Sequence, residues 1–121
     1  MKPAIKVLGV PDDINSSFMR GSSAAPPLIR EALYSASSNL FSESGLNLDQ
    51  KGIWEDLGDI ELAGEVAVEN FKKIKTFVKD VLVSNQKLVS LGGDHSVSWP
   101  ILDAHLDLSL IHISEPTRLQ Q

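Results

Sequence analysis

The 121-residue sequence contains no cysteine, and its basic residues are outnumbered by acidic ones. Without cysteine there is no disulfide framework, no thiolate zinc site and no cysteine nucleophile, which favours a reducing, cytoplasmic location. The 11 basic and 16 acidic residues give a net charge of −5. This charge argues against a nucleic-acid surface or a cationic membrane-binding face, and it favours a small or cationic partner.

Long apolar runs are missing as well. The apolar run near the amino terminus is too short for a signal peptide, and no stretch approaches the roughly 20 residues that a membrane-spanning helix needs. No internal repeat or low-complexity tract is present. A hydrophobic content of 42% is normal for a soluble globular chain, and the length predicts at most one domain.

Short apolar runs alternate with longer amphipathic stretches along the chain. Strands are predicted over Ile5–Val10, within residues 52–60 and over Leu88–Leu91. The first is ended by Gly9 and Pro11, the second stops at Gly58-Asp59, and the third is ended by Gly92 and Gly93. Helices are predicted from Ala25, over Glu65–Ser84 and after the last strand. Alternating strands and helices are typical of a parallel sheet with right-handed crossovers, so the predicted fold class is α/β.

The two upstream helices each carry an apolar stripe. In the first helix the stripe comprises Leu28, Ile29, Ala32, Leu33 and Ala36; in the second it comprises Ala67, Phe71, Ile74, Val78 and Val81. The other face of the second helix holds Lys72, Lys73, Lys75 and Lys79. Because Glu69 and Asp80 lie among these lysines, we interpret them as a solvated helix face and not as a basic binding patch.

The segment from Gly92 to Ser96 is the strongest candidate for a functional site. Gly92 and Gly93 end the third strand and place Asp94 and His95 at its carboxyl edge. Ligands bind at that edge in open parallel sheets, and a helix starting at Ser96 would add its backbone donors there. A carboxylate beside an imidazole suits a metal site. An ordinary strand-to-helix turn with a solvated Asp-His pair is the alternative.

Three motifs in order resemble the ureohydrolase family of arginases and agmatinases. The first combines Leu8-Gly-Val-Pro-Asp-Asp, Asn15-Ser-Ser-Phe-Met-Arg-Gly and Ala25-Pro-Pro-Leu-Ile-Arg; the second is Asp56-Leu-Gly-Asp; the third is Gly92-Gly-Asp-His-Ser. The resemblance covers residues 4 to about 107, and the third motif is the most specific. It implies a three-layer αβα fold with a parallel sheet, of which this chain holds about the first three strands.

The resemblance also implies a chemistry. Members carry two Mn²⁺ ions at the strand ends, and a metal-bridging hydroxide attacks the guanidinium carbon to give urea and an amine. On this pattern His95 is a metal ligand, Asp94 supports it from beside or behind, and Gly92, Gly93 and Ser96 are structural. The implied substrate is a small cationic guanidino compound, and the implied assembly of the intact protein is a trimer or hexamer.

A second stretch, Asp103-Ala-His105-Leu-Asp107, spells the family's next metal motif. Only Ser96–Leu102 separates it from the first, whereas a crossover between parallel strands takes a dozen or more residues. On a helix His105 would point nearly opposite the two aspartates. We therefore predict that this stretch is a decoy, lying in the helix that includes Trp99.

The last residues resemble no part of the family. Residues 108–118 correspond to the translation of a common sequencing-library adapter, so we predict a native part over 1–107 and a non-native tail over 108–121. Such a fragment would leave apolar faces uncovered, and it would be inactive because it holds one recognisable ligand. Two alternatives stay open: a formiminoglutamate hydrolase or deacetylase of the same fold, and a non-catalytic α/β module that binds an anion.

Overall fold

The computed structural model describes residues 5–16, 19–50, 52–62 and 66–113. Its strands and α-helices alternate in the order β1 (Ile5–Val10), α1 (Ala25–Leu33), β2 (Trp54–Asp59), α2 (Ala67–Val83), β3 (Lys87–Gly92) and α3 (Ser98–Ile113). Short 3-10 turns, η1 (Ser22–Ala24) and η2 (His95–Val97), precede α1 and α3. Among these described helices, none has the combined length and apolarity needed to cross a bilayer.

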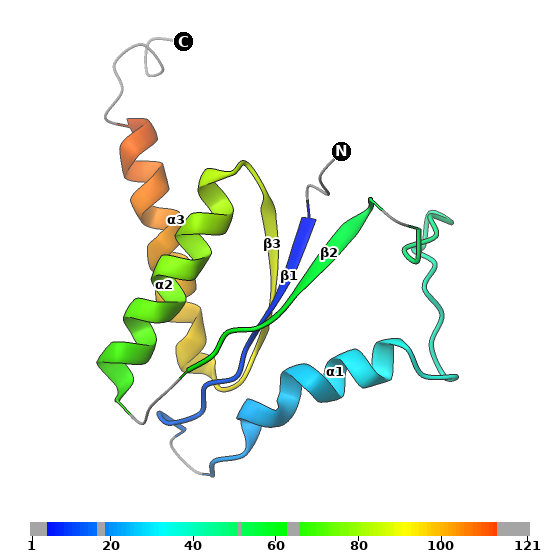
Figure 1. Ribbon diagram of the computed structural model, residues 1–121, viewed down its shortest axis with the longest axis horizontal. Helices are drawn as coiled ribbons and strands as arrows, with labels where there is room; N and C mark the ends of the chain where they lie inside the picture. The colour runs from blue at the N-terminus through cyan, green and yellow to red at the C-terminus, as the bar shows by residue number, and fades with distance from the viewer. Residues whose placement is uncertain (1–4, 17–18, 51, 63–65, 114–121) are drawn as a thin grey trace.

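The three strands form one parallel sheet in the order β2-β1-β3 (Figure 1). Ile5 at the start of the central strand lies opposite Trp54 of β2 and Lys87 of β3. Since parallel strands cannot be joined by a tight turn, α1 connects β1 to β2 and α2 connects β2 to β3. The predicted α/β class and strand positions are confirmed.

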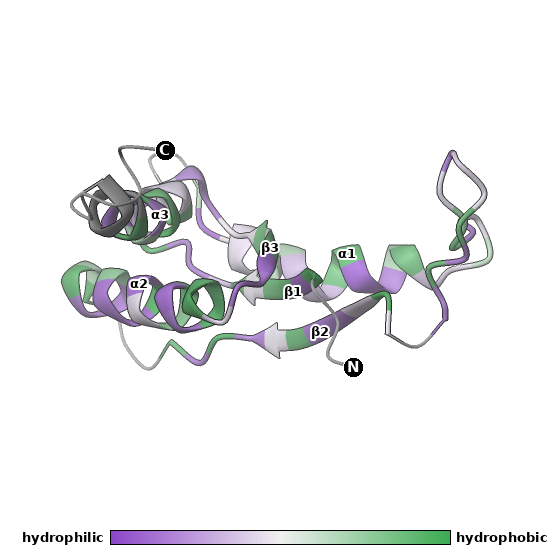
Figure 2. Cartoon of the chain, turned by 90° about the horizontal axis from the view of Figure 1, so that it is seen from above, coloured by the Kyte–Doolittle hydropathy of each residue, from purple (hydrophilic) through white to green (hydrophobic). Residues whose placement is uncertain are grey.

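Alternate residues of β1 face two different helical layers. Leu8 and Val10 are fully buried against α2 and α3, which pack side by side on one face of the sheet (Figures 1 and 2). Ile5 and Val7 point to the opposite face, where they line an apolar cavity with residues of α1. The arrangement is the three-layer αβα fold that the resemblance implied.

The core lies between the sheet and the α2–α3 layer. It comprises Leu8, Val10, Ile60, Ile74, Val78, Val97 and Ala104. Ile74 and Val78 of α2 are at most 1% exposed, so the centre of the predicted α2 stripe is buried. Most of the stabilising apolar burial in the described residues is therefore on this face.

The α1 face is covered less completely. A cavity of about 360 Å³ with an almost wholly apolar lining lies between α1 and the sheet, and Val89 beside it is 48% exposed. Leu28 and Ile29 belong to the predicted apolar stripe of α1, yet they remain 60% and 45% exposed. A single short helix on this face is too small to bury both its own apolar side chains and those of the strands.

The lysine face of α2 differs from the prediction. Lys75 Nζ lies 2.9 Å from Asp103 Oδ2 and 3.1 Å from Asp107 Oδ2, and Lys79 Nζ lies 3.4 Å from Asp107 Oδ2. Hydrogen bonds to Asp103 and then to Asp107 raise the pKa of Lys75. These two lysines therefore join α2 to α3. The interpretation of the whole face as solvated was wrong for them, because the partner helix supplies carboxylates that sequence position alone does not place.

Candidate functional site

The carboxyl ends of β1 and β3 meet at a point where the chain leaves the sheet in opposite directions. After β1 the chain runs to α1 on one face, and after β3 it runs to α3 on the other (Figure 1). Such a switch point opens a crevice between neighbouring strand ends, which is where open α/β sheets bind ligands. Two segments line it: the first loop, Pro11–Ser16, and the Gly-Gly turn, Gly92–Ser96.

The two segments are in direct backbone contact. Gly93 N donates to Val10 O over 3.0 Å, and Asp94 N donates to Asp12 O over 2.9 Å. A Cβ on Gly93 would lie 2.3 Å from Asp12 O, closer than any side chain tolerates. A Cβ on Gly92 would lie 2.7 Å from the Val97 side chain, and the nearest backbone atom, Asp94 O, would be 4.0 Å away. Gly93 is thus needed because the first loop touches its backbone.

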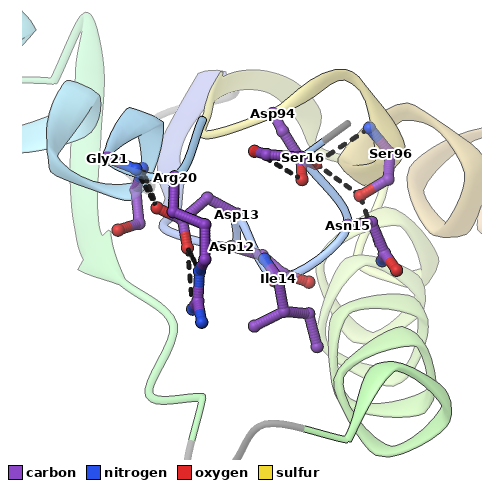
Figure 3. Close-up of polar contacts among 10 residues, drawn as sticks. Asp12, Asp13, Ile14, Asn15, Ser16, Arg20, Gly21, Asp94 and Ser96 are labelled. Atoms are coloured by element: carbon purple, nitrogen blue, oxygen red, sulfur yellow. Dashed lines mark hydrogen bonds and ion pairs between the residues drawn. The ribbon is translucent and has the colours of Figure 1, made fainter. Parts of the chain in front are cut away.

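Asp94 caps the structure that follows it. Its Oδ1 accepts a 2.9 Å hydrogen bond from Ser96 N and another from the Ser96 hydroxyl, while its Oδ2 accepts from Ser16 Oγ at 3.4 Å (Figure 3). Helical structure begins as the 3-10 turn η2, and α3 proper starts at Ser98, two residues later than predicted. Asp94 therefore orients the turn as an N-cap.

His95 lies between two residues that are held by hydrogen bonds. Its side chain is exposed, and no hydrogen bond or ion pair among the described residues engages the ring. Its backbone neighbours Asp94 and Ser96 are bound to each other and to the first loop. The imidazole is consequently free to bind a ligand while its backbone is anchored on both sides.

Asp13 organises the chain beyond the first loop, a role that the sequence did not reveal. Its Oδ2 accepts from Gly21 N at 2.7 Å and Ser23 N at 3.2 Å, and its Oδ1 accepts from Arg20 Nη2 at 3.0 Å. The Gly21 hydrogen bond, followed by those of Ser23 and Arg20, lowers the pKa of Asp13 to about 2 although burial opposes the shift. The carboxylate thereby fixes the entry to α1 (Figure 3).

A second anchor joins two of the three motifs. Arg30 of α1 donates from Nε to Asp56 Oδ2 over 2.7 Å and from Nη2 to Asp56 Oδ1 over 3.0 Å, and it also pairs with Asp59. A register shift in β2, with Gly58 at φ +78°, brings both aspartates to the same face. These bonds raise the pKa of Arg30. The second motif, Asp56-Leu-Gly-Asp59, therefore binds the helix that carries part of the first motif.

The predicted decoy motif does lie in a helix. Asp103 and Asp107 face α2, where both bind Lys75, whereas His105 is exposed and its Nδ1 lies 2.9 Å from Ile101 O in the same helix. The helix continues through residues 108–113, which rules out a strand there. The division of the chain at residue 107 remains a prediction, and residues 114–121 lie outside the described residues.

The side chains near His95 do not assemble a metal centre by themselves. In the described part of the chain, no three His, Asp, Glu or Cys side chains converge as metal ligands would. Asp94, the nearest carboxylate in sequence, already accepts hydrogen bonds at both oxygens. The exposed His95 imidazole can supply one ligand to a metal ion, whereas a site with two metal ions needs several ligands.

A groove of about 730 Å³ lies next to this site. Asp12, Asn15 and Ser96 form one end of its lining, and Phe71 of α2 and Trp99 of α3 form part of the rest. Their rings are 6.5 Å apart between centroids. His95 does not line this groove, so a molecule bound in the groove alone would not contact the His95 imidazole.

Comparison with known proteins gives consistent matches. The arginase family model matches residues 3–114. Arginase 2 of Arabidopsis thaliana is 36% identical over 109 residues, covering 85% of this chain and 32% of the relative. An agmatinase of Bacillus cereus is 32% identical over 124 residues, covering 97% of this chain and 41% of the relative.

The fold is also similar to that of solved arginase structures. The arginase from Medicago truncatula superposes with a TM-score of 0.71 at 32% identity, covering 84% of this chain and 34% of that one. The present chain thus spans about a third of the length of arginases that it resembles.

Proposed function

Because the chain belongs to the arginase family, we propose that it is part of a hydrolase that cleaves a C–N bond of a linear guanidino compound and releases urea. One observation carries the proposal: the Gly-Gly turn lies at the switch point between β1 and β3, with His95 exposed on an anchored backbone. That is where an α/β enzyme of this topology would bring a ligand.

We further propose two Mn²⁺ ions as the cofactor of the whole protein, with His95 as one ligand. Manganese takes oxygen and imidazole donors, which suits an imidazole at a sheet edge rich in carboxylates. The other ligands would come from residues beyond those described, since the described side chains do not complete a centre. Asp94, Gly92, Gly93 and Ser96 would act by shaping the turn.

Arginine and agmatine are both candidate substrates, because the relatives include proteins named arginase and agmatinase. A cytoplasmic location and a trimer or hexamer remain part of the proposal. Light scattering and cell fractionation of the longer gene product test these two points.

The alternative of an anion-binding module is disfavoured by the turn itself. Ser96 N, the backbone donor at the start of η2, already binds the Asp94 carboxylate. A negative side chain at this position repels a second anion and leaves that donor occupied.

Urea release tests the proposed function. We expect none from the 121-residue chain with Mn²⁺ and arginine or agmatine, because one imidazole cannot hold two metal ions. We expect manganese-dependent release from a longer product of the same gene, falling about 100-fold or more in His95→Ala and unchanged in His105→Ala. Equal losses in both variants would contradict the assignment of His95, and an inactive longer product would contradict the function.

A further inference from the structure

The first loop touches the Gly-Gly turn on both sides of His95. Ser16 Oγ donates to Asp94 Oδ2 over 3.4 Å, and Asn15 Nδ2 donates to Ser96 Oγ over 3.5 Å (Figure 3). Both bonds join residues about 80 positions apart in sequence, so only the meeting of β1 and β3 makes them possible. They are long bonds, and each adds a small restraint.

Two shorter hydrogen bonds of Asp12 place the loop so that the Asn15 and Ser16 side chains can reach the turn. Asp94 N donates to Asp12 O over 2.9 Å, and Asp12 Oδ1 accepts from Ile14 N at 3.1 Å, which turns the loop back toward the strand end. Asp12 is only 5% exposed. The first loop is therefore docked on the Gly-Gly turn, and its last two residues, Asn15 and Ser16, contact the turn.

We propose that Asn15 and Ser16 are positioning residues that fix the direction in which His95 presents its imidazole. Asp94 and Ser96 are tied to each other by the Asp94 carboxylate, and the loop holds each of them once more from outside. A ligand side chain acts best when its backbone is held before the ligand arrives. The role of His95 as a ligand rests on the proposed function. The contacts that hold Asp94 and Ser96 are observed in the structure and do not depend on it.

Matched substitutions at Ser16 separate this role from simple packing. Ser16→Thr keeps the hydroxyl, and Ser16→Val has nearly the same shape without it. In the full 121-residue chain, we expect amide hydrogen exchange at Asp94 and Ser96 to rise about fivefold in Ser16→Val, and to stay within about twofold of wild type in Ser16→Thr. The His95 side-chain couplings, measured by NMR, should shift toward rotamer averaging only in Ser16→Val.

Two further variants complete the test. Asn15→Ala, at an exposed position, should loosen Ser96 more than Asp94, and it serves if Ser16→Val does not fold. Ser37→Val removes an exposed hydroxyl that bonds only within its own loop, and should change nothing at His95. Identical His95 couplings in Ser16→Val and Ser16→Thr, or exchange that rises equally throughout the sheet, would overturn the proposal. No substrate or metal enters these measurements, so a failed urea assay leaves them unaffected.

Discussion

Two short segments of this chain contain the same chemical groups in different settings. In the Gly-Gly turn, Asp94 and His95 follow a strand, and the aspartate caps the next helix while the imidazole stays free. In α3, Asp103 and Asp107 bind Lys75, and His105 lies on the exposed side. The second segment matches a metal motif letter for letter, yet its backbone separates the three side chains. The residue types suggest a set of metal ligands, but the periodicity of the helix or strand that carries them decides whether their side chains point to one place.

The difference also shows in what supports each segment. The turn is held mainly by backbone contacts with the first loop, which leave no space for a side chain on Gly93. The α3 segment is held by exposed or half-exposed ion pairs together with the buried Ala104. Steric contacts with backbone are intolerant of substitution, whereas ion pairs near the surface are replaceable.

The largest expected effect comes from Gly93→Ala. Its Cβ would lie 2.3 Å from Asp12 O, so the first loop would have to move away from the Gly-Gly turn, at a cost of about 3 kcal/mol. Gly92→Ala is the control, because its one close contact is with the Val97 side chain and not with backbone, and it should cost about 1 kcal/mol. Urea-induced unfolding measures both. Equal destabilisation would show that the first loop does not rest against Gly93.

A smaller effect is expected from Lys75→Met. The substitution keeps the length of the side chain and removes the charge that Asp103 and Asp107 share, so the melting temperature should fall by a few degrees and α3 amides should exchange faster. Lys72→Met is the matched control, since Lys72 is exposed and has no ion pair in the described residues. If the two variants melt alike, the α2–α3 ion pairs contribute nothing.

The smallest effect is expected on acidification, and it should differ between the first loop, which supports the Gly-Gly turn, and the α3 segment. Asp13 has a folded pKa of about 2 against an ordinary 3.8, so its contribution is present above 3.8 and is lost as the pH falls toward 2. The pKa of Asp107 is also lowered, chiefly by Lys75, so its contribution is lost below 3.8 as well. Melting temperatures between pH 5 and pH 2.5 should fall less steeply in Asp13→Asn and Asp107→Asn than in wild type.

Exchange at single amides assigns each acid effect to its segment. Gly21 N donates to the Asp13 carboxylate, so this amide should be less protected from exchange in Asp13→Asn than in wild type. In Asp107→Asn its protection should equal that of wild type. Loss of Gly21 protection in both variants would mean that the loop and the α2–α3 contact open together.

Much of the architecture was determined locally. Pro11 follows the end of the strand at Ile5–Val10, and the three- and four-residue spacing of Ile74 and Val78 placed α2 correctly on the core. The short interval between Asp94 and Asp103 was enough to predict that the second motif is helical, because a crossover cannot fit in it. These features depend on neighbours within a turn or two of chain.

Only the tertiary structure decided which distant groups meet. Lys75 of α2 binds the carboxylates of α3 because α2 and α3 share one face of the sheet, and Arg30 binds both aspartates of β2 because a register shift turns Asp59 toward α1. Ser16 reaches Asp94 because β1 and β3 are neighbours although a whole strand and two helices separate them in sequence. Such contacts arise from strand order and register, which residue spacing along the chain does not encode.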